Sequence, residues 1–204
     1  MRILLACEFS GAVRRAFRDR GHDAWSLDLL PAEDGSPYHY QGDVRFVLTD
    51  IREWDMMIAF QPCTHLAVSG ARWFHNKQRE QREALDFVRM LMDMATMPRP
   101  LRIPRIAIEN PVSIIATKIR PSTQTIQPHQ FGHPEFKATC LWLTNLPKLI
   151  PTLPLKVPAK GTPEWKEWNR VHRASPGPDR WKERSRTYAG IAEAMAEQWG
   201  GEQL

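Results

Sequence analysis

Short apolar runs alternate with segments of helical periodicity along most of this chain. Apolar runs of strand length cover Arg2–Cys7, Asp23–Leu27, Met56–Phe60, Ile103–Ile108 and residues 139–143. Apolar residues recur at helical spacing after Gly11, over Gln78–Met97 and over Gly190–Gln198. This order of strands and helices predicts an α/β fold, with a doubly wound, mostly parallel sheet in a single domain.

The remaining segments set the expected organisation. Residues 32–41 and 64–77 are predicted as loops, and a short helical turn is expected after Gly42-Asp43-Val44, ending near Arg52. We divide the chain into a catalytic unit (1–150), a basic connector containing Pro and Trp (151–187) and a closing helical segment (188–204) that returns to the catalytic unit.

Positive charge concentrates in the connector. The chain carries a formal charge of +5, and residues 155–187 hold nine Lys or Arg against four Asp or Glu, interleaved with Trp165, Trp168 and Trp181. Basic grooves with aromatic platforms bind nucleic acid. The alternative is a solvated connector whose tryptophans pack onto the domain, and the sequence leaves both interpretations open.

Several classes of protein are not indicated. No apolar stretch reaches the ~18–20 residues that span a bilayer, and the apolar N-terminus is predicted as a strand, not a signal peptide, so we expect a cytoplasmic protein without membrane partners. The three cysteines form no CxxC pair, which argues against a disulfide framework or a zinc site. We expect no metal.

Acidic residues occupy three consecutive positions at the predicted sheet edge. The first is the turn Glu8-Phe9-Ser10-Gly11, where a glycine between strand and helix permits close approach of a ligand. Asp28 follows the second strand at the position of a ribose-binding carboxylate, and Asp43 is placed to contact an adenine amino group. Each acid alone is typical of a helix cap or a loop; together they favour an adenosyl ligand.

Cys63 and Glu109 follow two other predicted strands. A cysteine thiolate can add to C6 of a pyrimidine, and an acid at N3 with a raised pKa assists that addition. The adduct makes C5 nucleophilic toward an electrophilic carbon such as a sulfonium methyl. The pair is therefore the one expected for alkylation of a pyrimidine at C5.

Five motifs resemble those of the cytosine-C5 DNA methyltransferase family, in particular its short bacteriophage Dcm-like members, which lack a full target-recognition domain. Phe9-Ser10-Gly11 resembles the first motif (F-x-G-x-G), residues 61–70 the P-C motif, and residues 108–111 the E-N-V motif. Residues 131–137 resemble the segment around Q-x-R-x-R, and residues 188–195 are similar to the last motif, which lines the cofactor pocket.

The resemblance implies a Rossmann-like methyltransferase fold that uses S-adenosyl-L-methionine (SAM) to modify cytosine C5 in DNA. It implies Cys63 as the nucleophile, Glu109 as the acid and Lys137 as a partial substitute for the family's arginines. Cofactor binding is assigned to Phe9, Ser10, Gly11, Asp28, Asp43 and Pro62. Substrate binding is assigned to Ser69, Gly70, Asn110 and Pro111. The candidates for phosphate contacts are Arg170, Arg173, Arg180, Lys182, Arg184 and Arg186.

The chain departs from the family pattern at several positions. Val13 stands at the second glycine of the first motif, Thr64 follows the nucleophile in place of Gln, and Pro111 replaces Val. Only residues 144–187 occupy the place of a target-recognition domain. Two alternatives to DNA methylation therefore stay open: C5 modification of a free deoxypyrimidine nucleotide, with a methyl or another group, and a non-catalytic DNA-binding homologue.

Overall fold

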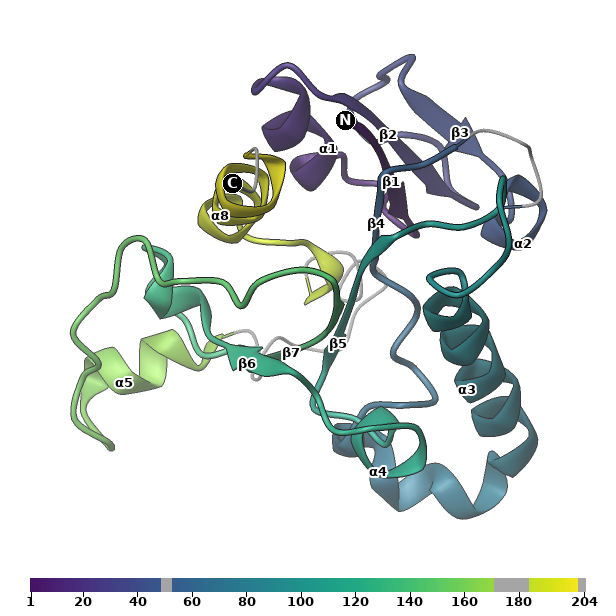
Figure 1. The fold of residues 1–204 in the computed structure, drawn as a ribbon. Helices are drawn as coiled ribbons and strands as arrows, with labels where there is room; N and C mark the ends of the chain where they lie inside the picture. Colours follow the sequence, from purple (N-terminus) through teal and green to yellow (C-terminus); the bar gives the residue numbers. More distant parts are fainter. Residues whose placement is uncertain (49–52, 171–183, 202–204) are drawn as a thin grey trace.

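The computed structural model describes residues 1–48, 53–170 and 184–201, and its centre is a seven-stranded sheet of order β3-β2-β1-β4-β5-β7-β6 (Figure 1). Its strands are β1 (Arg2–Ala6), β2 (Asp23–Asp28), β3 (His39–Gln41), β4 (Met56–Ala59), β5 (Arg105–Pro111), β6 (Gln124–Ile126) and β7 (Thr139–Thr144). The first five strands are mutually parallel, whereas β7 runs antiparallel to both β5 and β6. The fold is α/β with a mostly parallel sheet, as predicted.

The central strands are buried on both faces, which explains their continuous apolar sequences. In β1, Ile3 and Leu5 face one core while Leu4 and Ala6 face the other. The same alternation divides β4, whose four residues are all fully buried. A sheet with two apolar faces requires a layer of helices on each side.

Helices cover both faces of the sheet. On one face, α1 (Ala12–Arg18) packs beside α8 (Ala189–Gly200), which returns from the end of the chain (Figure 1). The other face carries α2 (Val44–Val47), α3 (Gln78–Asp93) and α4 (Ile115–Lys118). Within the described part of the chain, no helix combines the length and apolar character that would cross a membrane.

The structure corrects several predicted elements. The predicted loop 32–41 contains β3, a strand of three residues that is too short to show an alternating pattern. The predicted loop 64–77 contains a 3-10 helix, η1 (Val68–Asn76), and another 3-10 turn, η2 (Pro128–Gln130), precedes β7. Helix α3 ends at Asp93, before the predicted Met97, and β5 continues beyond Ile108 to Pro111. The predicted helical turn ending near Arg52 is observed as α2, and its last residues lie outside the described ones.

The start of the connector packs onto the domain. Helix α5 (Pro163–Trp168) begins at Thr162, whose hydroxyl accepts the Trp165 backbone N–H. Trp168 is buried, with its ring centroid 5.3 Å from Phe136 and 5.9 Å from His129. Trp165 also contacts Phe136. Both tryptophans therefore match the packing interpretation, while Trp181 lies outside the described residues.

Gly190, the second residue of α8, allows this helix to approach the chain before β7. Its N–H donates to His133 Nε2 at 2.9 Å, and a Cβ atom there would overlap the carbonyl oxygen of Phe131. We expect Gly190→Ala to lower the free energy of unfolding by about 2 kcal/mol through overpacking. Gly42→Ala is the control, since no heavy atom lies within 4 Å of its Cβ position. Equal stability of both variants in chemical denaturation would contradict this prediction.

Candidate functional site

Cys63 lies in a turn just beyond the carboxyl end of β4, the edge at which the sequence placed it. Its carbonyl oxygen accepts the backbone N–H groups of Leu66 at 3.0 Å and Ala67 at 2.9 Å. Leu66 is fully buried and anchors the turn in the core, while Cys63 itself is half-buried. The thiol is thus held at the sheet edge by a rigid turn. Pro62, assigned to the cofactor, is exposed beside it.

Glu109 was predicted to follow the end of its strand. The structure instead places it inside β5, which continues to Pro111. Strand β4 pairs with β5 only as far as Ala59 and Ile108. Beyond that point β7 supplies the partner of β5, and Glu109 is paired with Leu141. Because β4 ends at Ala59 and β5 continues, Glu109 still lies at the sheet edge where the chain leaves β4 toward the Cys63 turn.

A pair of amide side chains joins these two strands. Gln61 Nε2 donates to the carbonyl oxygen of Glu109 at 3.2 Å, and Asn110 Nδ2 donates to the carbonyl oxygen of Gln61 at 3.3 Å. Both side chains are buried. The predicted substrate residue Asn110 therefore has a clear structural role. Gln61 was not among the predicted site residues, although a polar residue between Phe60 and Pro62 was a signal for such a role.

Three charged groups act on one another around the thiol. Burial raises the pKa of Glu109, against the opposing effects of Lys137 and of a hydrogen bond from Thr139. The pKa of Cys63 is raised by burial and then by the charge of Glu109, while Arg184 and Lys137 lower it. Burial lowers the pKa of Lys137. The structure therefore gathers the predicted residues Cys63, Glu109, Lys137 and Arg184 in one place.

Lys137 is held by the segment that leads into α8. Its Nζ donates to the carbonyl oxygen of Arg186 at 3.1 Å and lies 5.5 Å from the centre of the Tyr188 ring. The Tyr188 hydroxyl in turn donates to Glu135, which also accepts from Arg170 Nε at 2.6 Å. Arg170, a candidate for phosphate contact, is therefore paired with a buried carboxylate. The candidates Arg173, Arg180 and Lys182 lie outside the described residues.

Ser69 and Gly70 follow the Cys63 turn in the chain, and Pro111 ends β5. Ser69 and Gly70 lie on η1 and are exposed and half-buried, respectively. Pro111 is the last residue of β5. The start of η1 is bonded to the segment after β5, through the Val68 N–H and the Val112 carbonyl at 3.0 Å. The two motifs containing these residues are therefore adjacent, and ligand contact by these residues stays a prediction.

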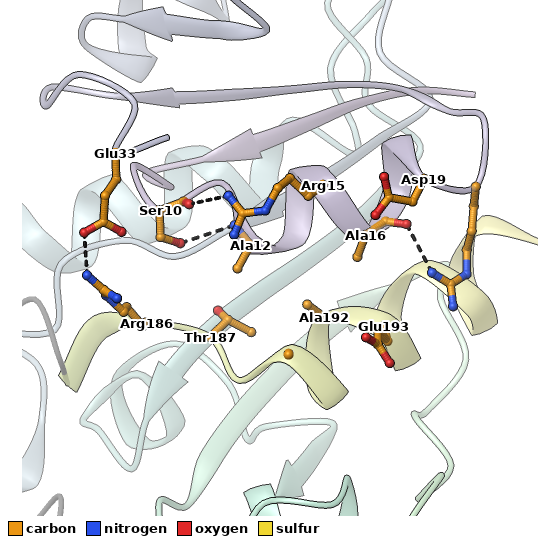
Figure 2. Close-up of a pocket in the computed structure, with 12 residues that line it drawn as sticks. Ser10, Ala12, Arg15, Ala16, Asp19, Glu33, Arg186, Thr187, Ala192 and Glu193 are labelled. Carbon is orange, nitrogen blue, oxygen red and sulfur yellow. Dashed lines mark hydrogen bonds and ion pairs between the residues drawn. The ribbon is translucent and has the colours of Figure 1, made fainter. Parts of the chain in front are cut away.

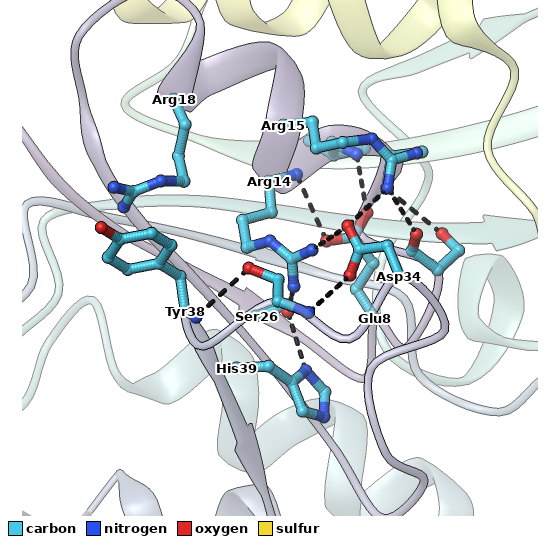
Figure 3. Close-up of polar contacts among 12 residues, drawn as sticks. Glu8, Arg14, Arg15, Arg18, Ser26, Asp34, Tyr38 and His39 are labelled. Carbon is cyan, nitrogen blue, oxygen red and sulfur yellow. Dashed lines mark hydrogen bonds and ion pairs between the residues drawn. The ribbon is translucent and has the colours of Figure 1, made fainter.

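Gly11 has a positive φ of 67°. The sequence suggested that its lack of a side chain makes space for a ligand, but the structure shows another use of that space. A Cβ atom would overlap the guanidinium of Arg14 and lie 3.0 Å from Asp34 Oδ2. Arg14 is fully buried, pairs with Asp34 at 2.5 Å and donates to Ser26 Oγ at 2.6 Å (Figure 3). The space that a Gly11 side chain would need is occupied by the Arg14–Asp34 ion pair. Phe9 precedes this turn, and its cofactor role stays a prediction.

Glu8 is a functional candidate that was predicted only as part of the turn Glu8-Phe9-Ser10-Gly11. The buried carboxylate accepts the N–H groups of Val13 at 2.7 Å and Arg14 at 3.3 Å, at the start of α1 (Figure 3). Burial raises its pKa to about 7, although these two hydrogen bonds act in the opposite direction. These two N–H groups are thereby satisfied from within the chain.

The two acids expected to hold an adenosyl group differ in their surroundings. Asp28 ends β2, is half-buried, accepts the Leu30 N–H at 3.0 Å, and has a pKa raised by burial. Asp43 caps α2 through the Arg45 N–H and pairs with the Arg45 guanidinium. Asp43 thus acts as the helix cap that was the alternative interpretation, whereas Asp28 still presents its carboxylate at the sheet edge.

A cavity of about 500 Å³ lies between the start of α1 and the start of α8 (Figure 2). Its lining includes Ser10, a predicted cofactor residue, and Arg186, which pairs with Glu33 across its wall. Arg186 therefore lines this cavity, and its phosphate contact stays a prediction. The remaining lining residues are Ala12, Arg15, Ala16, Asp19, Arg20, Thr187, Ala189, Ala192 and Glu193. Neither Asp28 nor Asp43 lines it.

Comparison with known proteins adds no assignment: no protein-family model matches the chain, and no curated protein matches it. Among the described residues, no group of three or more His, Cys, Asp or Glu is arranged to hold a metal ion. The chemistry of the site must therefore be argued from its own residues.

The charges around Cys63 predict how its thiol reacts. Glu109→Gln removes a negative charge, so alkylation by iodoacetamide at alkaline pH should accelerate about threefold to tenfold. Lys137→Met should slow it by a similar factor. The measurement is the pH dependence of the labelling rate by intact mass. Cys63→Ser is the control, because burial and the charges of Asp28 and Asp43 raise the pKa of Cys7 to about 12, and Cys140 is buried. Identical profiles in all variants except Cys63→Ser would contradict the prediction.

Glu8 predicts a dependence of stability on pH. Its folded-state pKa of about 7 exceeds the ordinary value of 4.5. The stabilisation from its bound proton is therefore complete below pH 4.5 and is lost as pH rises to about 7. Glu8→Gln, which resembles the protonated form, should match the parent protein near pH 4.5 and exceed it at pH 8, by at most about 3 kcal/mol. A constant difference between their denaturation midpoints from pH 4.5 to 8 would refute this.

Proposed function

We propose that this protein is a SAM-dependent methyltransferase that modifies C5 of cytosine in DNA. The observation that carries the proposal is the grouping of a thiol, a half-buried carboxyl and an ammonium group (Cys63, Glu109, Lys137) at the carboxyl edge of β4 and β5. Ligands of open α/β sheets bind at this edge. The motif resemblance assigns the same residues to the reaction, and the grouping supports that assignment.

Each group has a role in the addition. The Cys63 thiolate forms a bond to C6, and the displaced electron pair of the C5–C6 double bond is delocalised toward N3, where Glu109 donates its proton. When bound, SAM supplies an electrophilic methyl group to C5. The C5 hydrogen then leaves as a proton, and the electrons of that C–H bond restore the C5–C6 double bond as the Cys63 thiolate is expelled from C6. The added proton returns from N3 to Glu109. Cys63 thus ends the cycle unchanged.

The electrostatics of the resting site fit these roles. Because burial raises its pKa, Glu109 keeps its proton to a higher pH than an ordinary glutamic acid, which favours its role as a proton donor. Once that proton has moved to N3, the positive charge of Lys137 stabilises the carboxylate left behind. With Glu109 neutral, Arg184 and Lys137 both favour the thiolate form of Cys63. Protonation of Glu109 and ionisation of Cys63 therefore support one another.

The residues around the α1–α8 cavity are compatible with the amino-acid end of SAM. The cavity falls within the ~300–1,000 Å³ range of small-molecule sites. Ser10, Thr187 and the Arg186 guanidinium can bind a carboxylate, and Glu33 can bind an ammonium group. Arg186 also accepts the Lys137 hydrogen bond through its carbonyl oxygen, which links the cavity wall to the catalytic group. Asp28 remains available for a ribose.

The alternative substrate is a free deoxypyrimidine nucleotide. It is favoured by the described start of the connector, where Trp168 is buried and so cannot stack on a base, and where Arg170 is paired with Glu135. In that case Arg184, beside Cys63, is the candidate for binding the single phosphate.

Nucleoside mass spectrometry tests the proposed function. Purified protein with SAM is incubated with unmodified DNA and, separately, with dCMP, and the digests are analysed for C5-methylated product. We expect 5-methylcytosine in the DNA, and at least a thousandfold loss in Cys63→Ala because no adduct can form. Cys140→Ala, which removes a buried thiol from β7, should retain activity. Product from dCMP alone would establish the alternative, and product from neither would contradict the proposal.

A further inference from the structure

Arg186 contacts two parts of the molecule through its two ends. Its guanidinium pairs with the Glu33 carboxylate, 153 residues away in the chain, on the wall of the α1–α8 cavity (Figure 2). Its carbonyl oxygen accepts a hydrogen bond from Lys137 Nζ at 3.1 Å. The charge of Lys137 in turn acts on Cys63 and Glu109. One residue therefore connects the cavity wall to the charge beside the thiol.

The backbone fixes the Glu33 end of this connection. The Glu33 N–H donates to the Phe9 carbonyl oxygen at 2.9 Å, in the turn that precedes α1. The next residue, Asp34, pairs with the buried Arg14 at 2.5 Å and with Arg15 at 2.7 Å. The loop is thus held without the Glu33 side chain, so Glu33→Gln changes the ion pair and not the loop.

The position of the Lys137 ammonium group depends on the Arg186 carbonyl. The main chain of Lys137 is fixed separately, since its N–H donates to Gln127 Oε1 at 3.0 Å. Its side chain is a flexible stem, and within the described residues its hydrogen-bond acceptor is the Arg186 carbonyl oxygen. Burial and the nearby Arg184 lower the pKa of Lys137, while Glu109 acts in the opposite direction. If the carbonyl is displaced, the ammonium group is free to move toward solvent.

The Glu33–Arg186 pair is weak by itself. The Arg186 side chain is 52% exposed and the Glu33 side chain 38% exposed, and ion pairs in contact with water contribute little to stability. A ligand with a carboxylate and an ammonium group can bind Arg186 through the first and Glu33 through the second. Because such a ligand contacts both side chains only while they face the cavity together, it favours the arrangement in which Arg186 is held.

We propose that the α1–α8 cavity controls the Cys63 thiol through Arg186: a ligand whose amino-acid end bridges Glu33 and Arg186 fixes the Arg186 carbonyl, and with it the Lys137 ammonium group beside the thiol. The inference rests on the proposed function, in which SAM brings that amino-acid end, and adds regulation to the same site. Its consequence is an order of events, since the cysteine reaches its full reactivity only after the cofactor is in place.

Labelling of Cys63 by iodoacetamide at alkaline pH tests the connection without turnover. Glu33→Gln should slow the labelling about threefold, because release of Lys137 disfavours the thiolate. The direct effect of removing a negative charge is acceleration, so slowing identifies transmission through Lys137. In a Lys137→Met background, Glu33→Gln should change the rate by less than about 1.5-fold. Glu83→Gln is the matched control, since it removes an exposed carboxylate that pairs with Arg79 on α3.

Two ligands test the role of the cavity in the same assay. S-adenosylhomocysteine carries the amino-acid end of SAM but has no methyl group to transfer, and at saturation it should accelerate labelling of Cys63 about threefold. 5′-Methylthioadenosine lacks that end and should not accelerate it. Equal acceleration by S-adenosylhomocysteine in Lys137→Met would overturn the inference, and so would slowing by both ligands, which indicates simple blocking of the thiol.

An unchanged or faster rate in Glu33→Gln would also overturn the inference, as would an equal effect with and without Lys137. Titration calorimetry separates this outcome from failure of the proposed function. Binding of S-adenosylhomocysteine with no change in labelling overturns the inference and leaves the methyltransferase proposal intact. Absence of binding contradicts the proposed function, and the double-variant comparison alone then decides whether Glu33 controls Lys137.

Discussion

The point at which β4 stops pairing with β5 is the constraint on which the candidate site depends. Their parallel pairing ends at Ala59 and Ile108. The segment after β4 then leaves the sheet toward Cys63, whereas β5 continues through Glu109 and pairs with β7. Two buried amide hydrogen bonds between Gln61 and the backbone of β5, and between Asn110 and the backbone of Gln61, fix that divergence. Because a one-residue slip would turn every side chain to the other face, this register determines whether thiol and carboxyl share one edge.

The segment that leads into α8 forms the second part of the candidate site, through hydrogen bonds to residues 133–137. Lys137 donates to the Arg186 carbonyl, Tyr188 donates to Glu135, and Gly190 donates to His133. These contacts place positive charge beside Glu109 and close the wall of the α1–α8 cavity. The Glu135, Lys137 and Thr139 side chains are all engaged in this part of the structure: Glu135 accepts from Arg170 and Tyr188, and the Thr139 hydroxyl donates to the Lys137 carbonyl oxygen at 3.2 Å.

Much of the fold was predictable because the central strands are buried on both faces and their apolar runs are uninterrupted. The short strands β3 and β6 and the helix η1 were missed, since three residues show no period and η1 has no buried face. Cys63 and Glu109 were found from their positions after apolar runs, although Glu109 lies within β5. Glu8 and Gln61 received no role of their own, because a buried polar residue resembles a loop residue until its partners are known.

The sequence by itself determined the α/β architecture, the strand edge that carries Cys63, and the pairing of thiol and acid as candidate chemistry. Only the tertiary structure decided how the other polar residues are used. Gly11 makes room for the Arg14–Asp34 pair and not for a ligand, Asp43 caps a helix, and Arg186 lines a cavity. The physical reason is that apolar periodicity is a local property of the chain, whereas the partner of a charged side chain is set by residues distant in sequence that folding brings within hydrogen-bond distance.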